Sequence, residues 1–229
     1  MSNVKKLKRH GHTAEQVFRR LIEAILSGEL PSGQPVPELR LAQDWKVGRT
    51  PLREAMRRAA ESGFIVLRSN HRPVVRRLTA EDVRELYELR RLLELHALDR
   101  SWGDITPAQI QAIMKVAAQA RPGKASDWVK RCLELDLALH KLWTAGCGNR
   151  WLIRDLEHHY RFLRVLQRWV AKDPEALAMS YQEHVGILQA IQARDKARAL
   201  ALLGDHIAAS AKSVERALLR AETHRGPPA

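Results

Sequence analysis

The sequence lacks the features that mark membrane and secreted proteins. No apolar run approaches the roughly 18 residues that a membrane span needs. The basic start is not followed by the apolar stretch of a secretory signal. Two cysteines, Cys132 and Cys147, are too few for a zinc ribbon or a disulfide framework. We therefore expect a cytoplasmic protein that does not engage a membrane.

Common catalytic motifs are also missing. The chain has no His-Glu-x-x-His, no His-Asp dipeptide and no glycine-rich phosphate loop. Aromatic residues make up only 5% of the chain, while 45% of it is hydrophobic and 28% charged. This composition is ordinary for a globular protein, and 229 residues suffice for two modest domains.

Acidic residues are scarce in the first third of the chain. Residues 1–78 hold sixteen Lys and Arg against seven Asp and Glu, so they carry nine of the thirteen net positive charges. A small segment with this excess favours a polyanion as partner. A merely solvated basic surface would have the same composition, so charge alone leaves both interpretations open.

The pattern of residues 12–78 predicts a winged helix-turn-helix that follows a basic tail, 1–11. Thr13 and Gln16 form a capping box before the first helix. A short helix over 38–46 precedes one that begins at Thr50 and ends near Gly63. Segments 64–67 and 73–76 are typical of two short strands, the wing.

From Thr79 onward the pattern predicts six helices and no strand. The segments are long and polar on one side, which favours an antiparallel bundle over 79–222 with a frayed tail at 223–229. The expected starts are Thr79, Thr106, Ser126, Asn149, Asp173 and Asp195. The fold class is therefore mostly α, with a small β-hairpin wing.

The second helix of such a motif places its N-terminal end in the major groove of DNA. Arg49, Thr50 and Arg53 lie at that end, and Arg57 lies further along. Arg can bond two acceptors of a guanine at once, and Thr can contact a phosphate or a thymine methyl. Arg57 is better placed for phosphates, while His71 and Arg72 of the wing are candidates for the minor groove. The alternative is a basic helix face that contacts only water.

The bundle has polar side chains where apolar ones are expected. Asp136 and His140 lie one turn apart in a stripe with Leu133, Leu137 and Trp143. His184 and His206 occupy the apolar stripes of the last two helices. If these helices form a hairpin near Arg194-Asp195, both histidines lie roughly 15–18 Å from the turn at about 1.5 Å per residue.

Three imidazoles and a carboxylate at one depth suit a divalent transition metal, zinc first, with nickel or manganese as alternatives. A single inward histidine is more often a hydrogen-bonded core residue, but four such groups favour a metal because unpaired buried polar groups are costly. A hydrolase using the same residues is one rival interpretation. The other is an architectural DNA-binding dimer without an effector.

Arg90 lies in a predicted inward stripe with Leu86, Leu89, Leu93 and Ala97. A buried guanidinium needs an anion. One candidate is Glu94, one turn later; the other is the carboxylate of a small effector whose other end reaches the metal.

Two stretches resemble known families. Val47-Gly-Arg-Thr-Pro-Leu-Arg-Glu-Ala55, preceded by Glu38 and Leu41-Ala42, resembles the signature of GntR-family bacterial regulators. The bundle resembles the FCD ligand-sensing domain of the FadR branch, on Leu89–Glu94, the Asp136-x-x-x-His140 pair, Gly148-Asn149 and two later histidines. In having six predicted C-terminal helices rather than seven, the chain resembles the VanR-like subgroup of these regulators.

The resemblance implies a homodimer that binds a palindromic operator, with DNA contacts from Arg49, Thr50 and Arg53. It also implies that Asp136, His140, His184 and His206 hold the metal. Gly48 stands where the family usually has Ser, and Arg72 where it commonly has Gly. The resulting hypothesis is a transcriptional regulator, not an enzyme, that responds to a small organic acid.

Overall fold

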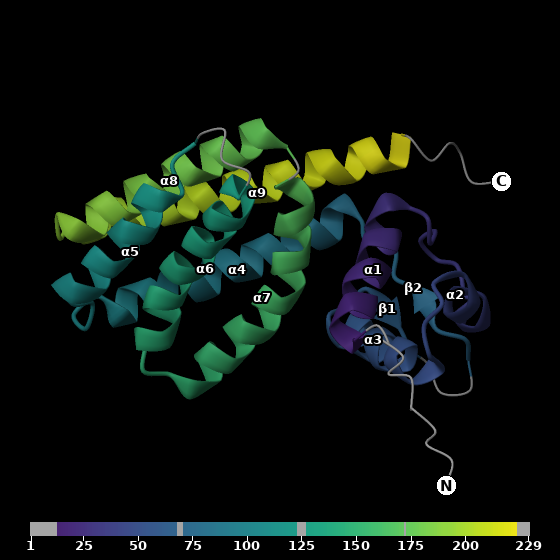
Figure 1. Cartoon of the computed structure of the whole chain (residues 1–229). Coiled ribbons are helices and arrows are strands. Elements are labelled where there is room, and N and C mark those ends of the chain that lie inside the picture. The colour runs from purple at the N-terminus through teal and green to yellow at the C-terminus, as the bar shows by residue number, and fades with distance from the viewer. Residues whose placement is uncertain (1–12, 68–70, 123–126, 172, 224–229) are drawn as a thin grey trace, which may run out of the picture. The chain divides into compact units, whose positions relative to one another are not determined.

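The structure is a computed structural model that describes residues 13–67, 71–122, 127–171 and 173–223 (Figure 1). The chain divides into two compact units between Leu78 and Thr79. The expected basic tail 1–11, the predicted helix start at Ser126 and residues 224–229 of the predicted frayed tail lie outside the described residues. No helix in the described ranges is long and apolar enough to cross a membrane.

The first unit is built from three helices and a hairpin: α1 (Ala14–Ser27), α2 (Glu38–Asp44), α3 (Arg49–Glu61), β1 (Ile65–Val66) and β2 (Val74–Val75). The predicted capping box of Thr13 and Gln16 is present at the start of α1. Gly28 ends this helix with a φ of 84°, a left-handed conformation that glycine adopts without strain. The wing pairs Ile65 with Val75 in antiparallel register.

A tight turn joins α2 to α3. Trp45 is buried there, and Lys46 adopts a φ of 53° that reverses the chain. The core beneath the two helices contains fully buried side chains of α1 and α3, namely Leu21, Leu52, Ala55 and Ala59. The predicted winged helix-turn-helix is confirmed, with strands shorter than the sequence pattern indicates.

The second unit consists, in its described part, of six helices: α4 (Ala80–Ser101), α5 (Pro107–Gln119), α6 (Trp128–Gly146), α7 (Arg150–Val170), α8 (Pro174–Gln192) and α9 (Lys196–Thr223). Thr79, Thr106 and Asp173 cap their helices with their side chains, as predicted. The Asn149 and Asp195 side chains accept bonds from the first turns of α7 and α9. Each such cap contributes about 1 kcal/mol.

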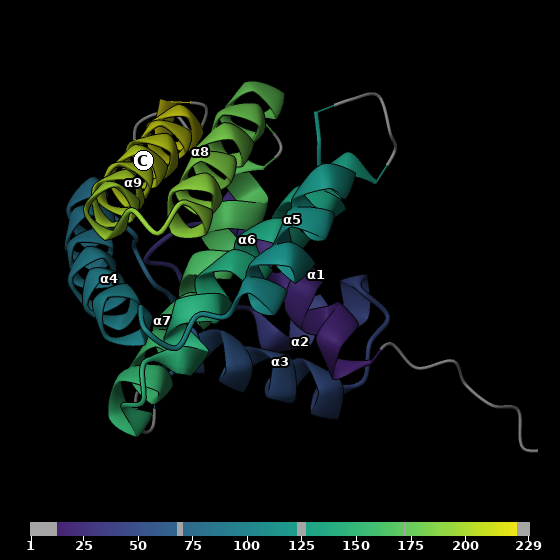
Figure 2. The ribbon, with the colours of Figure 1, turned by 90° about the vertical axis from the view of Figure 1, so that its left-hand side faces the viewer.

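Within the bundle, α8 and α9 form the predicted hairpin, and both packing and Figure 2 place α4 alongside α9. Arg194 turns the chain between α8 and α9 with a φ of 58°. The α6 helix packs against α4, α5 and α8, so it lies at the centre of the unit. Its fully buried side chains include Leu135, Leu139 and Trp143, each worth roughly 1.5–3 kcal/mol or more of hydrophobic stabilisation.

The sequence prediction of which side chains of α4 and α6 face the core is partly wrong. Leu89 is 46% exposed and Leu137 is 44% exposed, so neither belongs to the core. The buried face of α4 is instead Val83, Tyr87, Arg90, Glu94, Ala97 and Leu98. The reason is that α4 carries leucines on several sides, and a leucine count therefore does not fix which side faces inward.

Candidate metal and effector site

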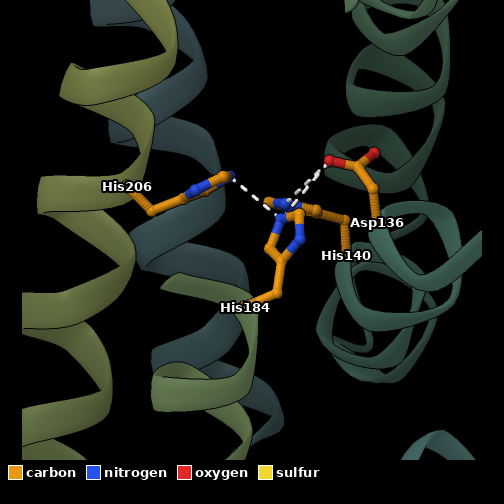
Figure 3. Close-up of side chains that lie close together, drawn as sticks. All are labelled: Asp136, His140, His184 and His206. Carbon is orange, nitrogen blue, oxygen red and sulfur yellow. Dashed lines mark hydrogen bonds and ion pairs between the residues drawn. The ribbon is translucent and has the colours of Figure 1, made fainter. Parts of the chain in front are cut away.

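The four polar residues of the predicted metal set converge in the bundle (Figure 3). Asp136 and His140 come from α6, His184 from α8 and His206 from α9. One potential ligand atom from each lies within 4.8 Å of all the others. The three histidines are at most 2% exposed, so they lie in the interior of the bundle, while Asp136 is partly exposed.

The separations within the cluster fit a single ion. Nε2 of His184 lies 3.2 Å from Nε2 of His206 and 3.4 Å from Oδ1 of Asp136. Nε2 of His140 lies 3.7 Å from the same Asp136 oxygen. Ligands about 2.1 Å from an ion stand roughly 3.0–3.5 Å apart at octahedral to tetrahedral angles. The residues present therefore fit a divalent metal without a large rearrangement.

Two further carboxylates orient the histidines. The Nδ1 of His140 lies 2.5 Å from Oε2 of Glu94, and the Nδ1 of His206 lies 2.8 Å from Oε2 of Glu183. An imidazole that donates from Nδ1 to an ionised carboxylate keeps the lone pair of Nε2 for the cluster, although Nη2 of Arg90 also lies 3.2 Å from Nε2 of His140. This carboxylate–histidine arrangement is the usual support of metal-binding histidines.

Burial and neighbouring charges shift the pKa values of three residues of the cluster and of Glu183. Burial lowers the pKa of His184 and that of His206, which keeps both imidazoles neutral, as metal ligands must be. Burial alone would raise the pKa of Asp136, but the hydrogen bond to His184 and the nearby His140 hold this pKa below its usual range. Burial, with Asp205 nearby, raises the pKa of Glu183 to about 7.

Arg90 lies on α4 beside the cluster and is fully buried. Its Nε donates to Glu94 at 2.5 Å, and its Nη2 lies 3.2 Å from Nε2 of His140. The ion pair with Glu94, the first alternative of the sequence analysis, is therefore present, and Nη2 of the guanidinium also lies beside His140. Burial alone would lower the pKa of Arg90, but the Glu94 carboxylate raises this pKa above its usual value, so the guanidinium stays charged.

Two buried polar atoms near the cluster have no hydrogen-bond partner among the described residues: Nη1 of Arg90 and the hydroxyl of Tyr87. Such an orphaned group costs about 1–3 kcal/mol unless a ligand or water satisfies it. Burial raises the pKa of Tyr87 to about 12, so this hydroxyl stays neutral.

A cavity of about 190 Å³ adjoins the cluster. Asp136, His184 and Tyr87 form part of its wall, and Cys132 lines it as well. Lys212 and Arg216, both exposed side chains of α9, supply positive charge along the same lining. The arrangement suits a small anionic molecule that reaches the cluster from this side.

The candidate DNA-reading residues lie on the exposed face of α3. Arg49, Thr50, Arg53 and Arg57 are all exposed. The Nε of Arg53 donates to Glu38 at 2.6 Å, so this side chain is held across the turn, and Arg57 pairs with Glu61. Arg57 and Arg53 thus have intramolecular acid partners that DNA phosphates would have to replace or share.

The start of α3 has open backbone donors. Gly48 occupies the cap position without a side-chain hydrogen bond, which leaves the first N–H groups of the helix available to an anion. On the wing, His71 and Arg72 are exposed, whereas the tip residue Asn70 lies outside the described residues.

Sequence reasoning missed Tyr87 and the interior position of Glu94, and it considered Glu183 only as a base beside His184 in the hydrolase interpretation, not as a partner of His206. Tyr87 and Glu94 stand three residues before and four residues after Arg90, which is the spacing of one helix face. That spacing was a usable signal, since a buried arginine is accompanied by groups on its own face. Glu183 had no such signal, because it contacts His206 across two helices.

Comparison with known families covers most of the chain. Residues 13–75 match the family described as bacterial regulatory proteins, gntR family. Residues 85–209 match the FCD domain and therefore include Arg90 and all four residues of the cluster.

Curated relatives and solved structures agree with these matches. The Nta operon transcriptional regulator of Aminobacter aminovorans is 29% identical over 179 residues, which cover 76% of this chain and 81% of the relative. The transcriptional repressor RspR of Escherichia coli is 26% identical over 88% of this chain and 89% of its own length. The structure of E. coli McbR/YncC has a TM-score of 0.65 at 16% identity and covers 89% of this chain and 97% of its own. The last similarity concerns the fold alone.

Proposed function

Since the chain belongs to the gntR family of bacterial regulatory proteins and carries an FCD domain, we propose that it binds a palindromic operator in double-stranded DNA as a homodimer and responds to a small organic acid. It is a transcriptional regulator and not an enzyme, so the hydrolase interpretation falls away. Two recognition helices of such a dimer stand about one helical turn of DNA apart, roughly 34 Å. A cytoplasmic location, in contact with the nucleoid, belongs to this proposal.

The DNA-reading role goes to the exposed start of α3. Arg49 and Arg53 project from its first turns and are the candidates for base edges, with Thr50 beside them. Arg57 lies further along the helix and fits a phosphate contact, and the exposed His71 and Arg72 of the wing are candidates for the minor groove. RspR, a relative, is a repressor, and we propose repression for this chain too.

The sensing role rests on the metal cluster. Asp136, His140, His184 and His206 would hold a divalent ion, zinc first and nickel or manganese as alternatives. When bound, such an ion supplies positive charge and a coordination position to a carboxylate. The observation that carries this proposal is the convergence of four ligand atoms within 4.8 Å in the bundle interior beside a cavity.

Charge supports an anionic effector. Arg90 and a divalent ion would place three positive charges in the interior, and Glu94 and Asp136 would offset two of them. Glu183 lies at the cavity wall and accepts a hydrogen bond from Nδ1 of His206; because burial raises its pKa to about 7, its carboxyl is only partly charged near neutral pH. An acid bound against Arg90 would neutralise what remains of the positive charge. Its binding changes DNA affinity only if it favours one arrangement of the dimer over another.

Metal analysis tests the sensing role. The purified protein is expected to hold about one equivalent of transition metal per chain, and His184→Ala is expected to lose it. His96→Ala, at an exposed position of α4, serves as the matched control and retains the metal. Less than half an equivalent in the native protein, unchanged in His184→Ala, would favour the architectural dimer instead.

Selection from random DNA duplexes tests the reading role. The enriched sites are expected to be palindromic, with half-sites about one turn apart, and sedimentation of the complex should give two chains per site. Enrichment of single, non-repeated sites would contradict the homodimer.

A further inference from the structure

A half-buried acid lies beside the candidate DNA-reading residues of α3. Glu38 is the first residue of α2, and its carboxylate accepts a hydrogen bond from Nε of Arg53 at 2.6 Å. The Glu38 side chain is 24% exposed and that of Arg53 is 69% exposed, so the carboxylate is largely covered while the guanidinium reaches into solvent. A carboxylate on a surface that approaches DNA phosphates weakens binding, because it offsets a positive charge.

The acid partners of the later arginines of α3 lie elsewhere. Arg57 pairs with Glu61 one turn later on the same helix, and Arg58 pairs with Glu15 of α1. Of these three arginines, Arg53 is the one that is held from α2, across the turn of the helix-turn-helix. The contact therefore fixes the Arg53 side chain relative to both helices of the motif.

The contact with Glu38 uses one donor of the guanidinium and leaves the others open. Nε of Arg53 is bonded, whereas Nη1 and Nη2 form no hydrogen bond within the described residues. Because the guanidinium is a rigid planar fork, the bond at Nε sets the direction in which the two terminal nitrogens point. Two parallel donors are what O6 and N7 of a guanine accept. A side chain that is already held loses less freedom on binding than one that must be immobilised.

We propose that Glu38 is a positioning residue for base reading, which orients Arg53 toward a guanine and keeps its guanidinium from nearby phosphates. This inference rests on the proposed function, because it presumes that α3 reads an operator in the major groove. Glu38 then lowers the affinity for DNA of any sequence and raises the preference for the operator. A residue that only stabilised the fold would not act in opposite directions on these two quantities.

The test uses the full chain in band-shift titrations on a selected operator and on random duplex, at several salt concentrations. Glu38→Gln is expected to bind random duplex more tightly, because it removes a negative charge and frees Arg53 for a phosphate. The slope of log Kobs against log salt on random duplex should steepen by up to about 0.9, the value of one added phosphate contact. The preference for operator over random duplex should fall by roughly two- to tenfold, which corresponds to immobilising one long side chain.

Glu61→Gln is the matched control, because it removes the acid partner of Arg57, the candidate phosphate contact on the same helix. It should strengthen binding to both duplexes by the same factor and leave the preference unchanged. Glu38→Asp keeps the charge but shortens the side chain, so it should lower the preference without strengthening binding to random duplex.

A double variant and altered operators localise the effect. In an Arg53→Ala background, Glu38→Gln should no longer change the preference, since no guanidinium is left to position. Among operators with single base-pair changes, Glu38→Gln should lose discrimination at the base pair to which Arg53→Ala becomes insensitive. A loss that persists without Arg53, or that is spread evenly over the site, would overturn the proposal.

The outcomes separate this inference from the proposed function. If an operator is selected and Glu38→Gln retains the native preference, Glu38 has no positioning role and the DNA-reading function stands. If selection enriches no site, the reading function itself is refuted, and the role of Glu38 with it.

Discussion

Glu94→Gln is expected to destabilise the bundle strongly. The Glu94 carboxylate is fully buried and accepts from Nε of Arg90, Nδ1 of His140 and Nε1 of Trp143. Gln keeps the shape but removes the charge, and Arg90 is then left in the interior without its closest counter-ion. Breaking a buried ion pair from one side costs about 3–5 kcal/mol. At about 2–4 °C per kcal/mol for a domain of 150 residues or more, the midpoint should fall by roughly 6–20 °C.

Urea and thermal unfolding measure this loss, in the presence of a chelator so that metal binding does not contribute. Glu88→Gln, at an exposed position of the same helix, should stay within about 0.5 kcal/mol of the native protein. The double variant Arg90→Met, Glu94→Leu should recover the part of the loss that comes from the unpaired charge, but not the part that arises because His140 and Trp143 lose their acceptor. A loss below about 1 kcal/mol in Glu94→Gln would refute the reasoning that Arg90 depends on this carboxylate.

Three further predictions concern DNA, metal and acid. In band-shift titrations, Arg53→Ala should lower the preference for a selected operator over random duplex by about 1–3 kcal/mol; equal loss on both duplexes would mean that Arg53 contacts only phosphate. Chelation should lower the unfolding temperature of the native protein, since an ion at a hundred times its Kd stabilises by about 2.7 kcal/mol, and it should not affect His184→Ala. Burial lowers the pKa of His159, whose Nε2 donates to the Leu86 carbonyl. Below about pH 6.5 the unfolded chain therefore binds a proton at this imidazole, whereas the native imidazole stays neutral. Stability should therefore fall as the pH drops from 7.5 to 5.5, and His159→Gln should fall less; equal slopes in urea unfolding would count against this.

Local signals predicted most of the fold. Thr13, Thr106 and Asp173 begin their helices because each side chain can satisfy backbone N–H groups a few residues later, which is a property of the sequence alone. The hairpin between α8 and α9 followed from the two stripes on either side of Arg194. Strand ends were less predictable, because the pairing of Ile65 with Val75 depends on both segments at once.

The candidate site was predictable to the extent that it depends on helix faces. The ligand set emerged because polar residues interrupted apolar stripes on α6, α8 and α9. The predicted inward face of α4 was right for Arg90 and Ala97 but wrong for Leu89, which resembles a core residue and is 46% exposed, whereas Glu94 resembles a surface residue and is fully buried. A carboxylate becomes an interior residue only when arginine and imidazole donors from other helices surround it, and such tertiary partners leave no periodic trace in the sequence.

Cys132 gives the protein a built-in chemical reporter. Its thiol lies on the cavity wall, is 4% exposed, and has a pKa that burial raises to about 11. Alkylating reagents attack the thiolate, so modification at neutral pH requires α6 to open first. An occupant of the cavity would hold that wall closed. The labelling rate of a native cysteine, without any introduced dye, would therefore register ligand binding.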